Sequence, residues 1–506
     1  MRFNHLSLRT RVLFLMICVL AGVLSIAACL LIKFDLPPRN QALYIEKRVA
    51  NHNPVITWAG NWIAGGLKSF DRSASMPFIP PISIGAKAAS DSVQPARSDT
   101  MNIVPAQTSA DVIRAIASAR PGDVITLAPG TYRFNGSHLA VAKPGTEKNR
   151  IVLRAEQPGS VVIEHDMTEG FLVSAPYWTF EHLIIRGICS GANGCEHAFH
   201  VVGGATYFIA RNNTITDFNA HFKINGAIGL MPDHGLIDGN ILTNTTIRHT
   251  ASAVTPVDLV AASDWVVRRN FISDFIKTSG NKVSFGAFAK GGGTGNRFEQ
   301  NIVICENRLK GADGHRVGLS LGGGGTGARF CRDQRCITEQ EGGVIEANLI
   351  ASCSDEGIYL NRSAGSKVRH NTVVNTAGIT VRFPESGADV EGNVVDSSIR
   401  SRDDGILRDI DNLDDAPLNT YFGLNSVRDV YHGDGTFAWR DQPPRRGVLP
   451  YSPLDLCGSK RPNAPAYGAF ERFSDCLMKS GQRDAANLSR DPELAGLDHS
   501  EKRHLP

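Results

Sequence analysis

One short pattern recurs along this sequence and constrains its fold more than any other feature. In each copy an asparagine is followed, after one residue, by an aliphatic residue. The copies are centred on Asn213, Asn240, Asn270, Asn301, Asn348, Asn371 and Asn393. Successive copies are 27, 30, 31, 47, 23 and 22 residues apart. Self-similarity at spacings of about 20–50 residues is typical of stacked repeat units.

The segments between these asparagines are short, alternate in polarity and end at Gly or Asn corners, and none has the length of a helix. This excludes leucine-rich and ankyrin-type arrays and favours stacked strands. We therefore predict an all-β fold, a right-handed parallel β-helix over residues 101–398. A short capping helix at Ala110–Ala119, with Ser109 as its N-cap, precedes the strands.

We expect the repeated asparagine to be structural. Asparagine tolerates the left-handed conformation of a tight corner, and stacked side-chain amides can hydrogen-bond to one another along the coil. The 47-residue step contains an insertion, Gly325 to Gly342, which we expect to form a loop on one face of the coil.

The N-terminus predicts a membrane anchor at residues 1–33. Val12 to Ile32 is a run of 21 apolar or small residues, preceded by basic residues, and about 20 such residues span a bilayer. Since basic flanks stay cytoplasmic, we expect the remainder in the periplasm or outside a bacterial cell. A processed signal is the alternative, including a lipoprotein modified at Cys29, because Ile26 to Cys29 resembles a lipobox.

Further boundaries follow from composition. Residues 34–100 are rich in Pro, Ser and Ala and predict a linker. Residues 399–480 lack the repeat and predict a loop-rich C-terminal cap, and residues 481–506 predict a polar tail.

The cysteines support an oxidising compartment. Apart from Cys18 and Cys29 there are eight, an even number that indicates disulfides. Close spacing suits three pairs, namely Cys189 with Cys195, Cys331 with Cys336, and Cys457 with Cys476. Zinc is the alternative, but no CxxC pair occurs. Sequence alone leaves the connectivity open.

The strands can be aligned on the glycines at positions 286, 318, 357 and 378, which places alternate side chains on opposite faces. The side chains predicted to point inward are Ala287, Ala289, Leu319, Leu321, Ile358, Leu360, Ile379 and Val381. Those predicted to point outward are Phe288, Ser320, Tyr359, Thr380, Lys290, Gly322, Asn361, Arg382, Asp258 and His200. With glycines at 291–293 and 322–325 as a floor, this strip predicts a groove for an extended sugar chain. The net charge of +3 argues against a nucleic-acid binder.

The segments APGTY and KPGTEKNRIVLRAEQPGSVVI, together with the asparagine repeats, resemble the parallel β-helix polysaccharide lyases of the chondroitinase B and alginate lyase type. The resemblance implies cleavage of uronate chains by β-elimination. In that family a lysine removes the proton beside the carboxylate, an arginine assists, and Ca²⁺ held by acidic residues neutralises the carboxylate. The proton on this carbon is only weakly acidic. Its removal therefore requires a base and neutralisation of the adjacent carboxylate charge.

Only some of the catalytic residues of that family have a counterpart in this sequence. Lys290 stands where the base is expected. The following strand carries no arginine, so Arg316 just before it is the substitute, and Asp258 is the nearest acid. These three are the predicted catalytic residues, and His200, Tyr359, Asn361 and Arg382 are the predicted substrate-binding residues. Ca²⁺ is the cofactor that the resemblance implies, but the sequence shows no ligand set for it.

Two functions follow. The first is an envelope-anchored protein that acts on or binds an acidic polysaccharide by lyase-like chemistry. The second is a non-catalytic carbohydrate-binding or scaffold protein that has lost the lyase residues. A third, an accessory protein in metal delivery, is disfavoured because the sequence lacks Met/His clusters.

Overall fold

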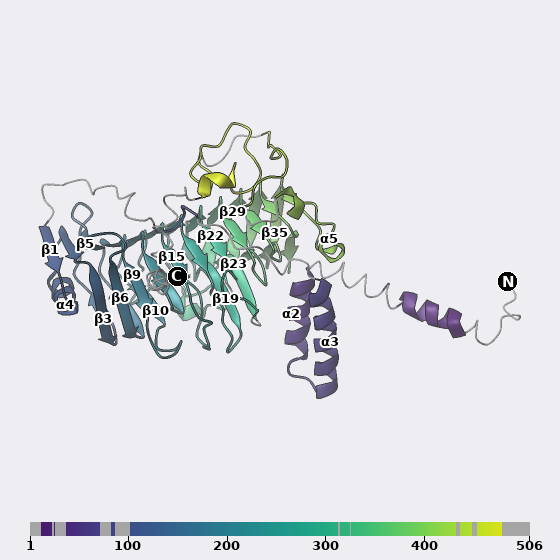
Figure 1. The fold of residues 1–506 in the computed structure, drawn as a ribbon, viewed down its shortest axis with the longest axis horizontal. Coiled ribbons are helices and arrows are strands. Elements are labelled where there is room, and N and C mark those ends of the chain that lie inside the picture. The colour runs from purple at the N-terminus through teal and green to yellow at the C-terminus, as the bar shows by residue number, and fades with distance from the viewer. Residues whose placement is uncertain are drawn as a thin grey trace, which may run out of the picture. The chain divides into compact units, whose positions relative to one another are not determined.

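The computed structural model describes residues 12–22, 25, 37–70, 82–86, 102–311, 314–323, 325–431, 436–447 and 453–477. The chain divides into two compact units. One comprises residues 1–72 and 415–425, and the other residues 73–414 and 426–506. Figure 1 shows the long stack of strands that forms the second unit.

The first unit is helical. Helices α2 (Pro38–Val49) and α3 (Pro54–Phe70) pack together, and α5 (Pro417–Phe422) belongs to the same unit. Two helices therefore stand where we predicted a linker. The physical reason is that Pro38 and Pro54 each lie in the first turn of a helix, where no backbone donor is needed.

The predicted anchor is described only in part. Residues 12–22 are helical, and apart from Ser25 the rest of the run to Ile32 lies outside the described residues. Within the described part of the chain, no helix is both long enough and apolar enough to cross a membrane.

The second unit is a parallel β-helix of three long sheets, as predicted. The 12-stranded sheet contains β1 (Asn102–Ala106), β2 (Asp123–Leu127), β5 (Ile151–Ala155), β8 (Trp178–Glu181), β11 (Ile209–Arg211), β14 (Leu236–Asp238), β17 (Val266–Arg268), β21 (Arg297–Glu299), β25 (Val344–Glu346), β29 (Ser366–Arg369), β32 (Gly387–Glu391) and β35 (Ile406–Ile410). The 10-stranded sheet contains β4 (Leu139–Val141), β7 (Glu169–Val173), β10 (His197–Val202), β13 (Ala220–Asn225), β16 (Val257–Val260), β19 (Val283–Lys290), β23 (His315–Gly322), β27 (Ile358–Asn361), β31 (Ile379–Arg382) and β34 (Ile399–Arg402).

The 11-stranded sheet contains β3 (Gly130–Gly136), β6 (Val161–Met167), β9 (Ile184–Gly187), β12 (Thr214–Thr216), β15 (Ile241–Thr243), β18 (Phe271–Ser273), β22 (Ile302–Ile304), β26 (Leu349–Ala351), β30 (Thr372–Val374), β33 (Val394–Val395) and β36 (Leu413–Asp414). A small sheet contains β20 (Gly293–Thr294), β24 (Gln340–Glu341) and β28 (Ser363–Ala364). The coil thus runs past its predicted end at residue 398, because Asn412 adds one more copy of the recurring asparagine.

Helix α4 (Ser109–Ser118) caps the N-terminal end of the coil, as predicted. Its N-cap is Thr108 rather than Ser109. The carboxylate of Asp111 accepts a hydrogen bond from the backbone N–H of Thr108, while the Thr108 hydroxyl accepts one from the N–H of Asp111. This reciprocal capping box fixes the start of the helix one residue earlier than the sequence pattern indicated.

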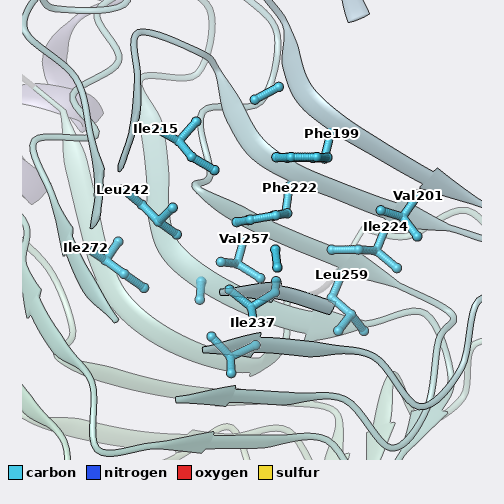
Figure 2. Close-up of a cluster of buried hydrophobic side chains, with 14 of the residues drawn as sticks. Phe199, Val201, Ile215, Phe222, Ile224, Ile237, Leu242, Val257, Leu259 and Ile272 are labelled. Atoms are coloured by element: carbon cyan, nitrogen blue, oxygen red, sulfur yellow. The ribbon is translucent and has the colours of Figure 1, made fainter. Parts of the chain in front are cut away.

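The interior of the coil is apolar and continuous. The eight side chains predicted to point inward from the 10-stranded sheet are all fully buried. Further along the coil Phe171, Phe199 and Phe222 occupy equivalent positions on neighbouring strands, with ring centroids 5.1 and 5.2 Å apart. Figure 2 shows Phe199 and Phe222 among the aliphatic side chains of adjacent turns.

The recurring asparagines form a continuous ladder inside one corner of the coil. The Oδ1 of Asn240 accepts hydrogen bonds from both the backbone N–H and the Nδ2 of Asn213, each at 3.0 Å. Asn270 does the same for Asn240, and the pattern continues to Asn412. Each of these bonds satisfies a buried amide, so the predicted stacking is confirmed.

The left-handed corner, however, falls on the residue before each asparagine. These preceding residues, all with φ between 49 and 67°, are Asn212, Gly239, Arg269, Gln300, Ala347, His370, Gly392 and Asp411. Our prediction that the asparagine itself turns the corner was therefore wrong. The chain turns one residue earlier, which leaves the asparagine side chain pointing into the coil.

Four disulfides stabilise this unit. Three join the predicted pairs, Cys189–Cys195, Cys331–Cys336 and Cys457–Cys476. The fourth, Cys305–Cys353, links adjacent turns in the core and encloses the insertion. Cys18 is free, and Cys29 lies outside the described residues.

The C-terminal cap covers the outer side of the 11-stranded sheet. Ile302, Leu349 and Val374 of that sheet pack against cap residues, among them Tyr431 and Phe470. Regular structure is sparse here, with the 3₁₀ turns η3 (Arg428–Val430) and η4 (Phe473–Cys476) among irregular loops. The predicted polar tail at 481–506 lies outside the described residues.

Candidate active site

The outer face of the 10-stranded sheet carries two rows of side chains, to which most of the strands contribute one residue each. The first row contains Leu172, His200, Lys223, Asp258, Phe288, Ser320, Tyr359, Thr380 and Arg400. The second row, two residues further along each strand, includes Asn225, Val260, Lys290, Gly322, Asn361, Arg382 and Arg402. Neighbouring members of a row are about 4.8 Å apart. The predicted outward strip is therefore present, in the predicted register.

Lys290 lies in the middle of the second row. Its Nζ is 4.3 Å from the centroid of the Phe288 ring. In the part of the chain that the structure describes, no carboxylate lies within ion-pair distance of this ammonium group. Beyond it, Gly322 presents no side chain, and a Cβ on Gly323 would lie only 3.2 Å from Lys290 Cδ. The glycines thus leave space beside the lysine, as a floor would.

The structure does not bring Asp258 and Arg316 to Lys290. Asp258 is buried and accepts a hydrogen bond at 2.9 Å from Lys223, its neighbour in the first row. Arg316 is buried and pairs with Glu306 at 2.6 Å. It stands opposite Ser284, which precedes Lys290 by six residues, or about 20 Å along the strand. The charges of both residues are already used inside the protein.

Three of the four predicted substrate-binding residues do meet. The Tyr359 hydroxyl accepts hydrogen bonds from Asn361 Nδ2 at 2.9 Å and from an Arg382 guanidinium N–H at 3.2 Å. Arg382 also pairs with Asp403. Since Tyr359 accepts two bonds, its own proton is available to a further partner. Burial raises the pKa of Tyr359, which keeps that proton in place at neutral pH.

Two carboxyl groups, those of Asp355 and Glu356, lie just before β27 in the chain. Asp355 accepts a hydrogen bond from His315, with Nδ1 and Oδ2 3.1 Å apart. Glu356 is buried, 3.7 Å from the Arg400 guanidinium. Burial and the neighbouring Asp355 charge raise the pKa of Glu356 to about 8. Although burial opposes it, hydrogen bonds from His315 and Glu356 lower the pKa of Asp355 to about 2. The pair therefore holds one proton near neutral pH.

His200 lies in a separate cluster, five strands from Tyr359 and so about 24 Å away. Its Nδ1 is 2.8 Å from Glu169 Oε1, and its Nε2 is 2.8 Å from Asn225 Oδ1. The ring of His197 is adjacent, with a centroid separation of 5.1 Å. Sequence reasoning missed Glu169 and His197. The spacing of two histidines three residues apart, within one strand, was the signal available.

The cofactor implied by the family resemblance does not fit beside Lys290. Ca²⁺ takes six to eight oxygen ligands, several of them carboxylates. Among the described residues, the only group of three or more potential side-chain ligands is Glu169, His197 and His200, which is rich in nitrogen. We therefore derive no step through Ca²⁺.

Comparisons with known proteins give one family model and several solved structures of low sequence identity. The family model described as chondroitinase B matches residues 106–243, a segment that ends before Lys290. A pectate lyase, Pel9A, is 16% identical, with 71% of this chain and 90% of that chain covered, at a TM-score of 0.49. An alginate lyase from Paenibacillus is 17% identical, with 62% and 99% covered, at a TM-score of 0.33. A rhamnogalacturonan lyase is 12% identical, with 60% and 81% covered, at a TM-score of 0.41. No curated protein sequence matches.

Proposed function

We propose that this chain, a parallel β-helix that resembles the polysaccharide lyases, binds an acidic polysaccharide along the outer face of its 10-stranded sheet and cleaves it by β-elimination. One observation carries the proposal. Lys290, with no acidic partner among the described residues, faces the Tyr359–Asn361–Arg382 cluster across Gly322. Tyr359 and Asn361 are two strands, or about 10 Å, from Lys290, and Arg382 is three strands, or about 14 Å, away, which leaves room for a sugar ring between long side chains.

The residues divide the chemistry as follows. The guanidinium of Arg382 and the amide of Asn361 bind the uronate carboxylate and a hydroxyl, and the positive charge stabilises the carbanion-like transition state. The Lys290 amine takes the proton from the carbon beside the carboxylate. The electron pair of that C–H bond forms a carbon–carbon double bond as the glycosidic C–O bond breaks. Tyr359 donates its proton to the departing oxygen.

The remaining predicted residues support the strands instead. Asp258 neutralises Lys223, the lysine of the first row. This leaves Lys290, the lysine of the second row, as the proposed base. Arg316, in β23, is held by Glu306, which lies in the segment between β22 and β23. Both therefore affect the site through the position of β16 and β23.

The proposed location is the bacterial cell envelope, with the coil in the periplasm or outside. It is supported by four disulfides, since disulfides persist in oxidising compartments. Anchoring through Val12–Ile32, with lipidation at Cys29 as the alternative, is part of this proposal. Labelling with a lipid precursor, with Cys29→Ser as control, separates the two.

The proposed activity is tested by incubating the protein with alginate, pectate, chondroitin and other uronates, with and without Ca²⁺. The readout is the ultraviolet absorbance of the unsaturated sugar that β-elimination leaves. We expect a signal on at least one polymer and its loss in Lys290→Ala. The matched control is Lys367→Ala, since this exposed lysine lies on the 12-stranded sheet.

The outcomes are distinct. A signal that persists in Lys290→Ala retains the lyase but overturns the assignment of its base. If no polymer gives a signal but one is retained on the immobilised protein, the protein binds carbohydrate without cleaving it. Neither signal nor retention overturns the proposal.

A further inference from the structure

The cluster of Glu169, His197 and His200 lies on the same sheet face but outside the proposed sugar site. His197 and His200 both belong to β10, and they share a side because Ala198 and Phe199 between them are both buried, which interrupts the usual alternation. Glu169, on the neighbouring strand β7, stands directly opposite His197. One ligand atom from each residue lies within 4.8 Å of the others.

The hydrogen bonds of Asn225 define which nitrogen of His200 carries a proton. Asn225 Nδ2 donates to the Gly226 carbonyl at 3.0 Å, so Asn225 Oδ1 is the atom that faces His200. Since Oδ1 only accepts, His200 Nε2 must be the donor across their 2.8 Å contact. The other nitrogen, Nδ1, then faces Glu169 Oε1 at 2.8 Å. A bare nitrogen and a carboxylate oxygen repel, so a cation must lie between them, either a second proton or a metal ion.

His197 distinguishes between those cations. Its Nδ1 is buried and has no hydrogen-bond partner in the structure. The same atom is 3.8 Å from Glu169 Oε1, too far for a hydrogen bond. An ion pair between Glu169 and a protonated His200 leaves this buried nitrogen unsatisfied, whereas a metal bound at the centre of the cluster uses it as a ligand.

We propose that Glu169, His197 and His200 bind a divalent transition-metal ion of the zinc class. Bonds of about 2.0–2.2 Å to nitrogen and oxygen place neighbouring ligand atoms roughly 3–3.5 Å apart. The observed 2.8 and 3.8 Å bracket that range, so small side-chain rotations suffice. Two imidazoles and a carboxylate suit zinc and its neighbours rather than Ca²⁺.

The surroundings hold the ligands in place. Asn225 orients His200, as second-shell partners of metal-bound imidazoles do. The Cys189–Cys195 disulfide closes the loop that ends two residues before His197. Lys223, the first-row neighbour of His200, is paired with Asp258 at 2.9 Å, so its charge is neutralised. The three side chains remain 17–26% exposed, which leaves the metal's open positions accessible from the sheet face.

The test uses untagged, full-length protein that has been stripped with a chelator and titrated with zinc chloride in a calorimeter. We expect one saturable site per chain, weakened at least 100-fold in His197→Ala and at least tenfold in the isosteric Glu169→Gln. Asn225→Leu removes the orienting bond to His200 together with the bond to the Gly226 carbonyl, and loss of an orienting bond typically costs 10–100-fold in affinity. Cobalt substitution gives a second readout, since the visible spectrum of bound Co²⁺ reports nitrogen ligation.

His234→Ala is the matched control, because His234 is an exposed histidine 3.5 Å from a carboxylate, Asp264, outside the cluster. We expect its zinc affinity to equal that of the unmodified protein. Equal unfolding temperatures of the metal-free variants show that the fold is intact. Absence of a saturable site, or a site that His197→Ala and Glu169→Gln leave unchanged, overturns the proposal. The measurement needs no polysaccharide, so its failure is distinct from failure of the proposed lyase.

Discussion

Glu169 and Glu356 lie near opposite ends of the same sheet face, and each precedes the first-row residue of its own strand by three positions. Their environments differ completely. The imidazoles of His197 and His200 lower the pKa of Glu169 to about 2, against the opposing effect of burial. Burial and the charge of Asp355 raise the pKa of Glu356 to about 8.

The difference teaches that the backbone of the coil does not determine the chemistry of a position. The same place in two turns holds a permanent anion at the N-terminal end and a proton at the C-terminal end. The first arrangement suits a bound cation, and the second suits proton transfer to or from a substrate. The neighbouring groups decide between them, since the imidazoles on the adjacent strand β10 act on Glu169, whereas burial and the preceding residue Asp355 act on Glu356.

The largest expected effect concerns the proton-transfer end. If Tyr359 is the acid of the proposed elimination, Tyr359→Phe lowers kcat on the preferred uronate polymer by about 10²–10⁴-fold, the usual contribution of general acid catalysis. The ring stays but the hydrogen bonds from Asn361 and Arg382 are lost, so we expect a small fall in the unfolding temperature and compare kcat where both proteins are folded. Tyr207→Phe, an exposed tyrosine at a corner, is the control. An unchanged kcat would assign the acid to another group.

A second change tests the scaffold that both ends share. In Asn301→Ala, the Asn270 N–H and amide lose the acceptor that Asn301 Oδ1 provides, and the Val267 carbonyl loses a donor. Unsatisfied buried groups cost about 1–3 kcal/mol each, so we expect the free energy of unfolding to fall by about 2–5 kcal/mol in urea titrations. Asn412→Ala, at the last and less buried rung, should cost less. Equal losses in the two variants would show that the contribution of each asparagine to the free energy of unfolding does not depend on its burial.

Glu356 should make the folded protein less stable as the pH rises. Because its folded pKa of about 8 exceeds the ordinary value of 4.5, the folded state holds a proton that the unfolded state has lost between these values. Stability from this group is complete below pH 4.5 and is lost as the pH rises to about 8, with a slope up to about 1.4 kcal/mol per pH unit. Glu356→Gln should remove this slope in unfolding titrations at successive pH values. A slope that Glu356→Gln leaves intact belongs to another group.

Glu169 should give the opposite pH dependence of stability, and its effect should be the smallest of those predicted. Its folded pKa of about 2 lies below the ordinary 4.5, so its contribution is present above pH 4.5 and is lost as the pH falls towards 2. Partial exposure weakens the interaction, so we expect a shallower slope than for Glu356. Glu169→Gln, measured without metal, should flatten this acid limb. Retention of the limb in the variant would place the responsible carboxylate elsewhere.

The fold could be predicted because the asparagine pattern records a backbone requirement in every turn. The same logic gave the facing of Lys290, Tyr359 and Arg382, since alternation along a strand is a local property. Contacts between turns were less accessible. Nothing in the sequence around Arg316 indicates that Glu306 neutralises it, and the interrupted alternation that unites His197 with His200 depends on packing of Phe199 in the core. The helices α2 and α3 were missed because proline also begins helices.

The Cys305–Cys353 bond has a consequence for how this protein could change over evolutionary time. It ties two successive turns together on either side of the insertion, so the alignment of the turns no longer depends on the length of the chain between them. The part of the insertion before Glu339 and β24 can therefore change in length and sequence more freely than the strands around it. New sequences in this loop change the surface beside the sheet while the paired turns on either side stay joined by the disulfide.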